Sequence, residues 1–287
     1  MARPHIEYVQ VQRLPWDAAV YGDLRPGVDA KVLSVDSEDG ECSVLLRYPA
    51  NWERGVSEHL LVHEELFVLD GAIEIAGVEY GKGFYANLPA GYERPTASSK
   101  DGAAVLTFFS ATPKAGRGKP ANGLYDDALL IKCIDSLGMP WNDRPFDRKI
   151  DPGIVYGHNK TLRIDPYTGE ITNLFGTGPQ THPDGWAAKL EKHECVEEMY
   201  LLTGDIHAGN CGVMQAGAYF WRPADIYHGP YASMAGYVSF FRCIHGKMYN
   251  IWSDDKVDFG WNPPYKPVVP PEMKKYVQEP MAQTPNF

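Results

Sequence analysis

The segments HECVEEMYLLTG (His193–Gly204) and GAYFWRPADIYHGP (Gly217–Pro230) decide the fold of this chain. Both are rich in aromatic and aliphatic residues and end in tight turns, which predicts two paired β-strands. Side chains four residues apart share one face of a strand, so we expect His193 and Glu197 to point into the concave side of a small barrel. His228 follows a proline turn and could add a third ligand from the paired strand. Histidine together with carboxylate suits zinc, iron, manganese, nickel or copper.

Composition narrows the class of protein. The chain has 287 residues, of which 22% are charged and 12% aromatic, which is typical of globular domains. Its net charge of -10 argues against nucleic-acid binding, which needs a basic surface. The five cysteines include no CxxC pair, which indicates free thiols in a reducing compartment. No apolar stretch approaches a membrane span or a signal core, so we expect a cytoplasmic protein without a membrane partner.

An internal duplication organises the chain. Short strands separated by turn signals predict an all-β barrel or sandwich. EELFVLDG (Glu64–Gly71) matches EEMYLLTG (Glu197–Gly204), and the spacing from Gly83 to Pro89 matches that from Gly217 to Pro223. Landmarks in one order at an almost constant offset indicate two copies of one β unit. We expect the first domain at residues 1–125 and the second at residues 126–287, with a proline-rich tail.

These residues resemble the cupin superfamily. His193, Glu197 and Gly204 have the spacing of the first cupin motif, and Gly217–His228 has that of the second. The doubled Glu197-Glu198 and the sequence HGPY from His228 are most similar to ChrR-type cupins, the class found in a zinc anti-sigma factor. The resemblance covers both copies and implies a bicupin, two tandem double-stranded β-helix (jelly-roll) barrels. It also implies one divalent metal ion per chain, with Fe(II) favoured over Zn, Mn or Ni.

The departures from the cupin pattern concern the metal ligands. Glu191 stands where cupins usually have their first histidine, and it shares strand parity with His193. It is interpreted as a fourth ligand beside His193, Glu197 and His228, or as a catalytic base, or as neither. In the first copy Leu60 and Arg94 replace the two histidines and only Glu64 remains. Leucine and arginine cannot bind a first-row metal, so we expect a metal-free first barrel.

Other side chains near the motifs are assigned by strand parity. Tyr200, Trp221 and Arg242 are candidates to line the substrate pocket, although barrel aromatics are more often core residues. Glu198 is expected to face outward as a solvated charge. Cys195 shares the face of the ligands, but a small buried thiol is the favoured interpretation.

The implied function is that of a metal-dependent enzyme. Two histidines and one carboxylate leave metal positions open for substrate and O2, which favours a non-haem Fe(II) dioxygenase cleaving a C–C bond in a small aromatic or dicarbonyl compound. A lyase or isomerase that polarises a carbonyl, with Glu191 as base, is an alternative. A metal-containing sensor or binding protein of the ChrR type is another. Exposed barrel edges and long arms favour a homodimer.

Overall fold

The computed structural model describes residues 3–18, 21–142, 157–183, 185–209, 211–278, 281, 285 and 287. Within these residues the chain forms antiparallel sheets with a few short 3-10 helices. The helices are η1 (Val11–Arg13), η2 (Asp127–Leu129), η3 (Pro271–Met273) and η4 (Tyr276–Gln278). The predicted all-β class is therefore confirmed. No helix of this described part is long and apolar enough to cross a membrane.

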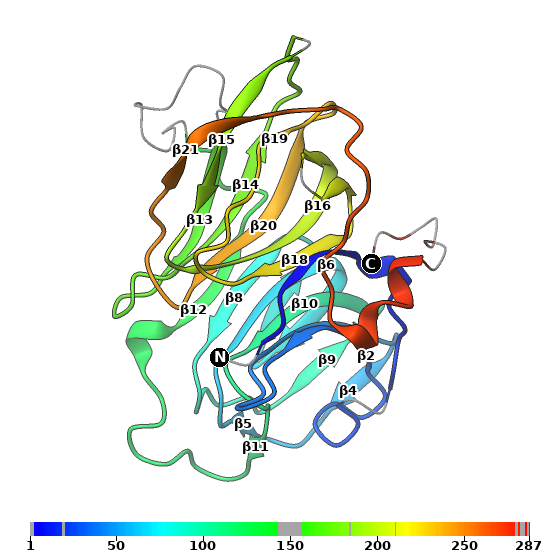
Figure 1. Ribbon diagram of the computed structural model, residues 1–287. Coiled ribbons are helices and arrows are strands. Elements are labelled where there is room, and N and C mark those ends of the chain that lie inside the picture. Colours follow the sequence, from blue (N-terminus) through cyan, green and yellow to red (C-terminus); the bar gives the residue numbers. More distant parts are fainter. Residues whose placement is uncertain are drawn as a thin grey trace. The chain divides into compact units, whose positions relative to one another are not determined.

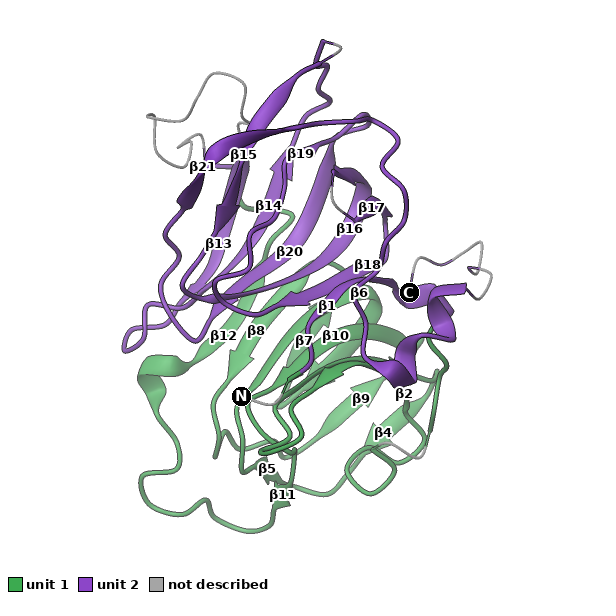
Figure 2. Cartoon of the chain, in the orientation of Figure 1, with its two compact units in different colours: residues 1–3, 14–139 green, residues 4–13, 140–287 purple. Residues whose placement is uncertain are grey.

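The chain divides into two compact units (Figure 2). Unit 1 consists of Met1–Arg3 and Leu14–Met139, and unit 2 of Pro4–Arg13 and Pro140–Phe287. The division follows strand pairing, because β12 (Ile131–Asp135) pairs with β8 (Phe84–Leu88), and β1 (Ile6–Gln10) pairs with β18 (Ala218–Arg222). The units thus separate after Met139 rather than at residue 125, and an N-terminal segment belongs to unit 2.

Unit 1 is built on an antiparallel sheet with the strand order β12-β8-β6-β10-β3-β2. Strands β4, β7 and β9 belong to the same sheet but lie off this path. Its remaining strands are β2 (Asp29–Val35), β3 (Cys42–Tyr48), β4 (Trp52–Arg54), β5 (His59–Leu60), β6 (Glu64–Ile75), β7 (Val78–Gly81), β9 (Ala97–Ser99), β10 (Ala103–Phe109) and β11 (Ala115–Gly116). Strands β5 and β11 form a separate pair. Aliphatic and aromatic side chains of these strands make one core cluster.

Unit 2 repeats this plan with the order β1-β18-β16-β20-β14-β13. Its remaining strands are β13 (His158–Ile164), β14 (Ile171–Thr177), β15 (Ala187–Lys192), β16 (Val196–Ala208), β17 (Gly212–Gln215), β19 (Tyr231–Ala232), β20 (Tyr237–Ile244) and β21 (Ile251–Asp258). Strands β17 and β19 pair with β16, while β15 and β21 run side by side as a separate two-stranded sheet (Figure 1).

The predicted duplication has a backbone counterpart in the long strands β6 and β16. Gly71 and Gly204 occupy matching places and both have positive φ, 69° and 83°. A Cβ on Gly71 would lie 2.0 Å from the carbonyl oxygen of Gly102, and a Cβ on Gly204 would lie 1.9 Å from that of Gly236. Only glycine fits both requirements, so the matched glycines mark the same bend in each unit.

Candidate metal centre

Backbone pairing brings the predicted ligands to one place in unit 2. Glu191 lies on β15, His193 follows that strand, and Glu197 lies at the start of β16. The amide of Glu191 donates to the carbonyl of His228 at 3.1 Å, and the amide of His228 donates back at 2.9 Å. The amide of Asp225 also donates to the carbonyl of His193 at 2.7 Å. The loop before β19 is thereby fixed against the end of β15.

Both histidines are held by the ring nitrogen that faces away from the centre. The Nδ1 of His193 lies 3.0 Å from the carbonyl oxygen of Tyr249, and the Nδ1 of His228 lies 2.9 Å from that of Ile226. A carbonyl only accepts, so each Nδ1 carries a proton and donates it, and each Nε2 is the ring nitrogen that faces the centre. Orientation of this kind is what metal-binding histidines require of their surroundings.

The free Nε2 atoms meet two carboxylates. The His193 Nε2 lies 3.2 Å from Glu197 Oε1, and the His228 Nε2 lies 3.3 Å from Glu197 Oε2 and 3.8 Å from Glu191 Oε1. Glu191, His193 and His228 each offer a ligand atom, and these atoms lie within 4.8 Å of one another. The buried Nε2 of His193 meets the geometry of a hydrogen bond with no group, and its contact is the ion pair with Glu197. A buried imidazole nitrogen whose contact is a carboxylate oxygen fits a divalent metal ion placed between the two.

Glu197 is also held by a buried cation. Arg222, which lies opposite Glu197 in the register of β16 and β18, donates to it from Nη1. The same guanidinium binds Glu7 of β1, with 2.9 Å from Nε to Oε2, and donates to the hydroxyl of Tyr231 at 2.7 Å. Burial alone would raise the pKa of Glu197, but His228, Arg222 and a hydrogen bond from His193 outweigh it and hold that pKa well below its usual range.

The other ionisable groups are shifted in different directions. Burial and the charge of Glu197 raise the pKa of Glu191 to about 7. Burial lowers the pKa of His228 to about 4, with Arg222 adding to the effect. Burial would lower the pKa of His193 too, but hydrogen bonding and charge from Glu197 raise it to about 9. A bound cation would favour the deprotonated form of all three groups.

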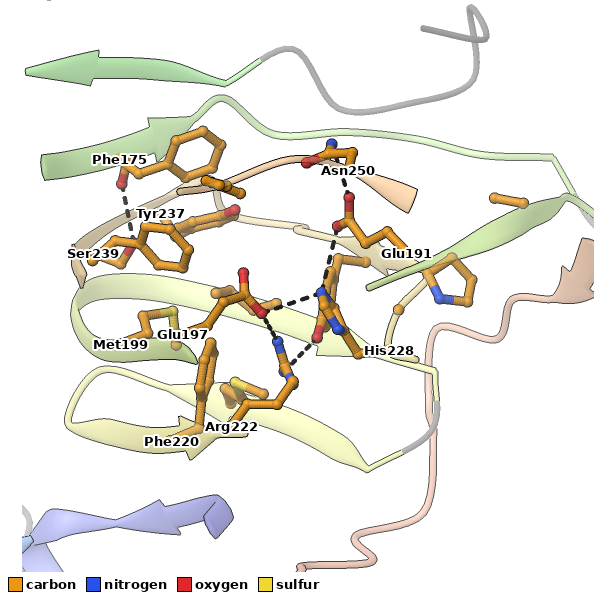
Figure 3. Close-up of a pocket in the computed structure, with 18 of the residues that line it drawn as sticks. Phe175, Glu191, Glu197, Met199, Phe220, Arg222, His228, Tyr237, Ser239 and Asn250 are labelled. Atoms are coloured by element: carbon orange, nitrogen blue, oxygen red, sulfur yellow. Dashed lines mark hydrogen bonds and ion pairs between the residues drawn. The ribbon is translucent and has the colours of Figure 1, made fainter. Parts of the chain in front are cut away.

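Glu191, Glu197, Arg222 and His228 form the polar end of a cavity of about 170 Å³ (Figure 3). The remaining wall is largely aromatic, aliphatic and thioether. Its apolar side chains include Phe175, Trp186, Met199, Ile206, Met214, Phe220, Tyr237, Phe241, Met248 and Trp252. Water has few polar partners along such a wall, which favours an apolar ligand.

The pocket residues expected from the sequence lie elsewhere. In the register of β16, Glu197 and Met199 face the cavity, so Glu198 and Tyr200 face the other side of the sheet. Trp221 and Arg242 are the cross-strand partners of Glu198 and lie on that side as well. They are buried there and do not line this cavity, which corrects the expectation.

Glu198 also differs from expectation. It faces away from the cavity as predicted, but it is buried rather than solvated. Its carboxylate accepts from Arg242 at 2.6 Å and from the hydroxyl of Tyr219 at 2.5 Å. Buried charges are normally paired in this way, and a single sequence does not reveal the partners.

Sequence reasoning missed Arg222, Tyr237 and Glu7. Arg222 and Phe220 are two residues apart, so they point to the same face of β18. Placing either side chain inside the barrel would have placed the other there too, which is a weak signal. Glu7 gave no signal, because it reaches the site from the opposite end of the chain. Cys195 is buried, with its thiol hydrogen-bonded to that of Cys243, in agreement with the expected buried thiol.

The matching place in unit 1 holds an ion-pair network. Arg94 donates to Glu64 from Nη1, and Arg25 lies 3.9 Å from the same carboxylate. Arg25 also pairs with Glu58 at 2.8 Å, and Leu60 is fully buried beside them in the core. The carboxylate corresponding to Glu197 is therefore neutralised by guanidinium groups.

A family model described as "Domain of unknown function (DUF4437)" matches residues 7–251, most of the chain. The chain belongs to this family. No curated protein matches the sequence.

Solved structures show the fold. A candidate dioxygenase from Nostoc punctiforme is similar with a TM-score of 0.68 and 17% identity, over 90% of this chain and 83% of that one. An oxalate decarboxylase structure gives a TM-score of 0.54 and 12% identity, over 86% and 79%. The Bacillus subtilis oxalate decarboxylase at pH 4.6 gives 0.52 and 12%, over 85% and 78%. With the antiparallel sheets of both units, these likenesses confirm two tandem cupin barrels.

Proposed function

We propose that this protein is a metal-dependent cupin enzyme whose second barrel binds one divalent ion through His193, His228, Glu191 and Glu197. The observation that carries the proposal is the pair of buried imidazoles, each fixed through Nδ1 and each directing Nε2 toward carboxylates. The cluster contains the carboxylates of Glu7, Glu191 and Glu197 and one guanidinium, that of Arg222. With all three carboxylates ionised and both histidines neutral, about two negative charges are left for a divalent cation to balance.

Each side chain has a distinct role in this proposal. His193 and His228 bind through Nε2, and the carboxylates add oxygen donors. Arg222 keeps Glu197 ionised and oriented, while the apolar wall excludes water from the reacting end. When bound, a divalent ion here supplies a Lewis acid and, in the case of iron, a centre for chemistry with O2.

We further propose that the reaction is dioxygenation with cleavage of a C–C bond in a small aromatic or dicarbonyl substrate, with Fe(II) as the ion. The largely apolar cavity and the likeness to a candidate dioxygenase support this choice. The similarity to ChrR-type cupins, the homodimer and the metal-free first barrel stay predictions.

Metal analysis and oxygen uptake test the proposal. The protein as purified should contain about one divalent ion per chain, as expected for a single cupin site. The iron-loaded chain should consume O2 with enolisable or phenolic compounds, and His228→Gln should abolish both metal retention and uptake. His158→Gln, at an exposed position on β13, is the matched control and should keep both. Absence of O2 uptake with every compound of these classes would contradict the dioxygenase.

A lyase or isomerase is the second candidate, and Glu191 favours it. Its carboxylate lines the cavity, receives a hydrogen bond from Asn250 at 3.2 Å and has a pKa raised to about 7 by burial and Glu197. A carboxylate of that pKa can exchange a proton with a substrate near neutral pH. Turnover under strictly anaerobic conditions, lost in Glu191→Gln, would support this candidate over the dioxygenase.

A further inference from the structure

The cavity of unit 2 has two chemically different ends. Figure 3 shows Glu191, Glu197, Arg222 and His228 joined by ion pairs at one end. Beyond them most of the wall is apolar, and it comes from β14, β16, β17, β18, β20 and β21 and from loops between strands. A ligand that spans this space must therefore have a polar part and an apolar part.

The charges at the polar end limit the anionic groups that a ligand can carry. Arg222 is already engaged by Glu7, Glu197 and the hydroxyl of Tyr231. Among the described lining residues, the other side chain with a fixed positive charge is Lys189 on β15, the strand that pairs with β21. Strands β14, β16, β17 and β20 contribute no cationic side chain to the described lining, so a second carboxylate buried against them would carry a large desolvation cost.

The volume limits the apolar part. A cavity of about 150 Å³ lined by apolar side chains binds benzene in another protein, so about one aromatic ring fills such a space. The cavity here is about 170 Å³. A substrate as small as a two-carbon diacid would leave most of it empty, while a fused bicyclic ring would exceed it.

The apolar end is closed by tightly packed core side chains. Met199, Ile206, Met214 and Phe220 belong both to the cavity wall and to the buried core cluster of unit 2. Met214 is fully buried, and Ile206 lies opposite it in the pairing of β16 with β17. These two side chains therefore form a rigid limit to the space.

We propose that the substrate has one oxygen-donor head, held at the polar end, and one apolar body the size of a single six-membered ring. Met214 and Ile206 set that size. The head group in this proposal depends on the proposed function. The apolar body is inferred from the cavity alone.

Hydroxamates separate the two parts, because they combine a metal-binding head with a chosen body. We would titrate the zinc-loaded chain with acetohydroxamate, benzohydroxamate and 2-naphthohydroxamate by calorimetry. Benzohydroxamate should bind about 10- to 100-fold more tightly than acetohydroxamate, as expected for burial of one ring. 2-Naphthohydroxamate should bind more weakly than benzohydroxamate. Equal affinity for the methyl and phenyl compounds, or tightest binding of the naphthyl compound, would overturn the proposal.

Variants of the limiting side chains test the assigned positions. Met214→Ala should reverse the order of the phenyl and naphthyl compounds, and the milder Ile206→Val should narrow their difference if the first variant folds poorly. An unchanged order in a folded Met214→Ala and an unchanged ratio in Ile206→Val would overturn the assignment.

A measurement that needs no turnover distinguishes this inference from the proposed function. In the chain labelled with ¹³C at the methionine methyl groups, benzohydroxamate should shift the signals of Met199 and Met214. The exposed Met234 is the internal control and should not shift. Such shifts without any O2 uptake would contradict the dioxygenase alone, whereas O2 uptake without ring-dependent shifts would contradict the substrate class alone.

Discussion

Glu197 shares one carboxylate between two histidines and Arg222, and this sharing defines the polar end of the cavity. An unpaired carboxylate in this buried position would tend to take up a proton. The guanidinium of Arg222 keeps this carboxylate ionised. It also engages oxygen lone pairs that would otherwise be available to a metal ion. The carboxylate of Glu191 is not bound to an arginine in the described structure. More of its oxygen lone pairs are therefore available to a metal ion than those of Glu197.

We expect the phenol of Tyr237 to bind the head group of a ligand. It lines the cavity from β20, and burial followed by the charges of Glu191 and Glu197 raises its pKa beyond the usual range (Figure 3). Its hydroxyl therefore stays protonated and can donate a hydrogen bond. We expect Tyr237→Phe to weaken benzohydroxamate binding to the zinc-loaded chain about fivefold, the cost of one neutral hydrogen bond.

The control for Tyr237→Phe is the same substitution at a tyrosine outside the cavity. Tyr227→Phe, at an exposed position, should bind benzohydroxamate as the unaltered chain does. Metal content should stay the same in both variants, because neither phenol belongs to the donor set. Unchanged affinity in Tyr237→Phe would show that its hydroxyl does not reach the ligand.

At the scale of elements, strand β1 contributes a buried charge to the site. Burial would raise the pKa of Glu7, but Arg222 and a hydrogen bond with His5 lower it from 4.5 to about 2. A carboxylate with a depressed pKa stabilises the fold fully above about pH 4.5, and this contribution is lost as the pH falls through about 2. Its size is about 3 kcal/mol at neutral pH.

Glu7→Gln should therefore lower the free energy of unfolding most at neutral pH. The difference from the unaltered chain should narrow as the pH falls below about 4.5, since the native carboxylate is then losing its advantage. Urea unfolding across this range measures it, with Glu79→Gln at an exposed position of β7 as control. A difference that is constant with pH would mean that the Glu7 charge does not stabilise the fold.

The bend in β16 gives a second prediction for an element. Gly204→Ala combines positive φ with a Cβ placed 1.9 Å from the carbonyl oxygen of Gly236. Gly185 has a similar φ of 74°, but a Cβ added there would meet no atom within 4 Å. We expect Gly185→Ala to cost about 1 kcal/mol of conformational strain. Gly204→Ala should cost at least about 2 kcal/mol more, because the clash involves backbone.

Urea unfolding of both variants tests this difference. Equal losses of stability would mean that β16 relaxes around the added methyl group without strain. Gly71→Ala in unit 1 should behave like Gly204→Ala, because its Cβ would meet the carbonyl oxygen of Gly102 at 2.0 Å.

The sequence predicted elements better than it predicted which face a side chain occupies. Spacing located the strand that carries Glu197 and the turn before His228, because strand periodicity and turn residues are local properties. Tyr200 and Trp221 were candidates for the pocket and lie on the other side of the sheet, since hydrophobicity marks both faces of a strand that is buried on each side. Glu7 and Arg222 could not be paired from the sequence, because nothing local connects residues at opposite ends of a chain.

At the scale of the whole molecule, duplication has produced two different charge arrangements from one plan. In unit 1 arginines surround Glu64, and in unit 2 histidines and one arginine surround Glu197. A guanidinium satisfies a buried carboxylate within the protein itself. An imidazole with its Nε2 lone pair facing the same carboxylate does not, and it leaves a cation to be supplied from outside.

This difference predicts how a metal ion stabilises the chain. A ligand that binds only the folded state at 100 times its dissociation constant adds about 2.7 kcal/mol to the free energy of unfolding. Removing metal with a chelator should therefore lower the midpoint of thermal unfolding, and adding Zn²⁺ or Fe²⁺ back should restore it. The double variant His193→Gln/His228→Gln should unfold at the same temperature with or without metal, while His158→Gln should respond as the unaltered chain does. If the double variant were still stabilised by metal, the ion would bind outside this centre, and unit 1 would have to be reconsidered as the place that holds it.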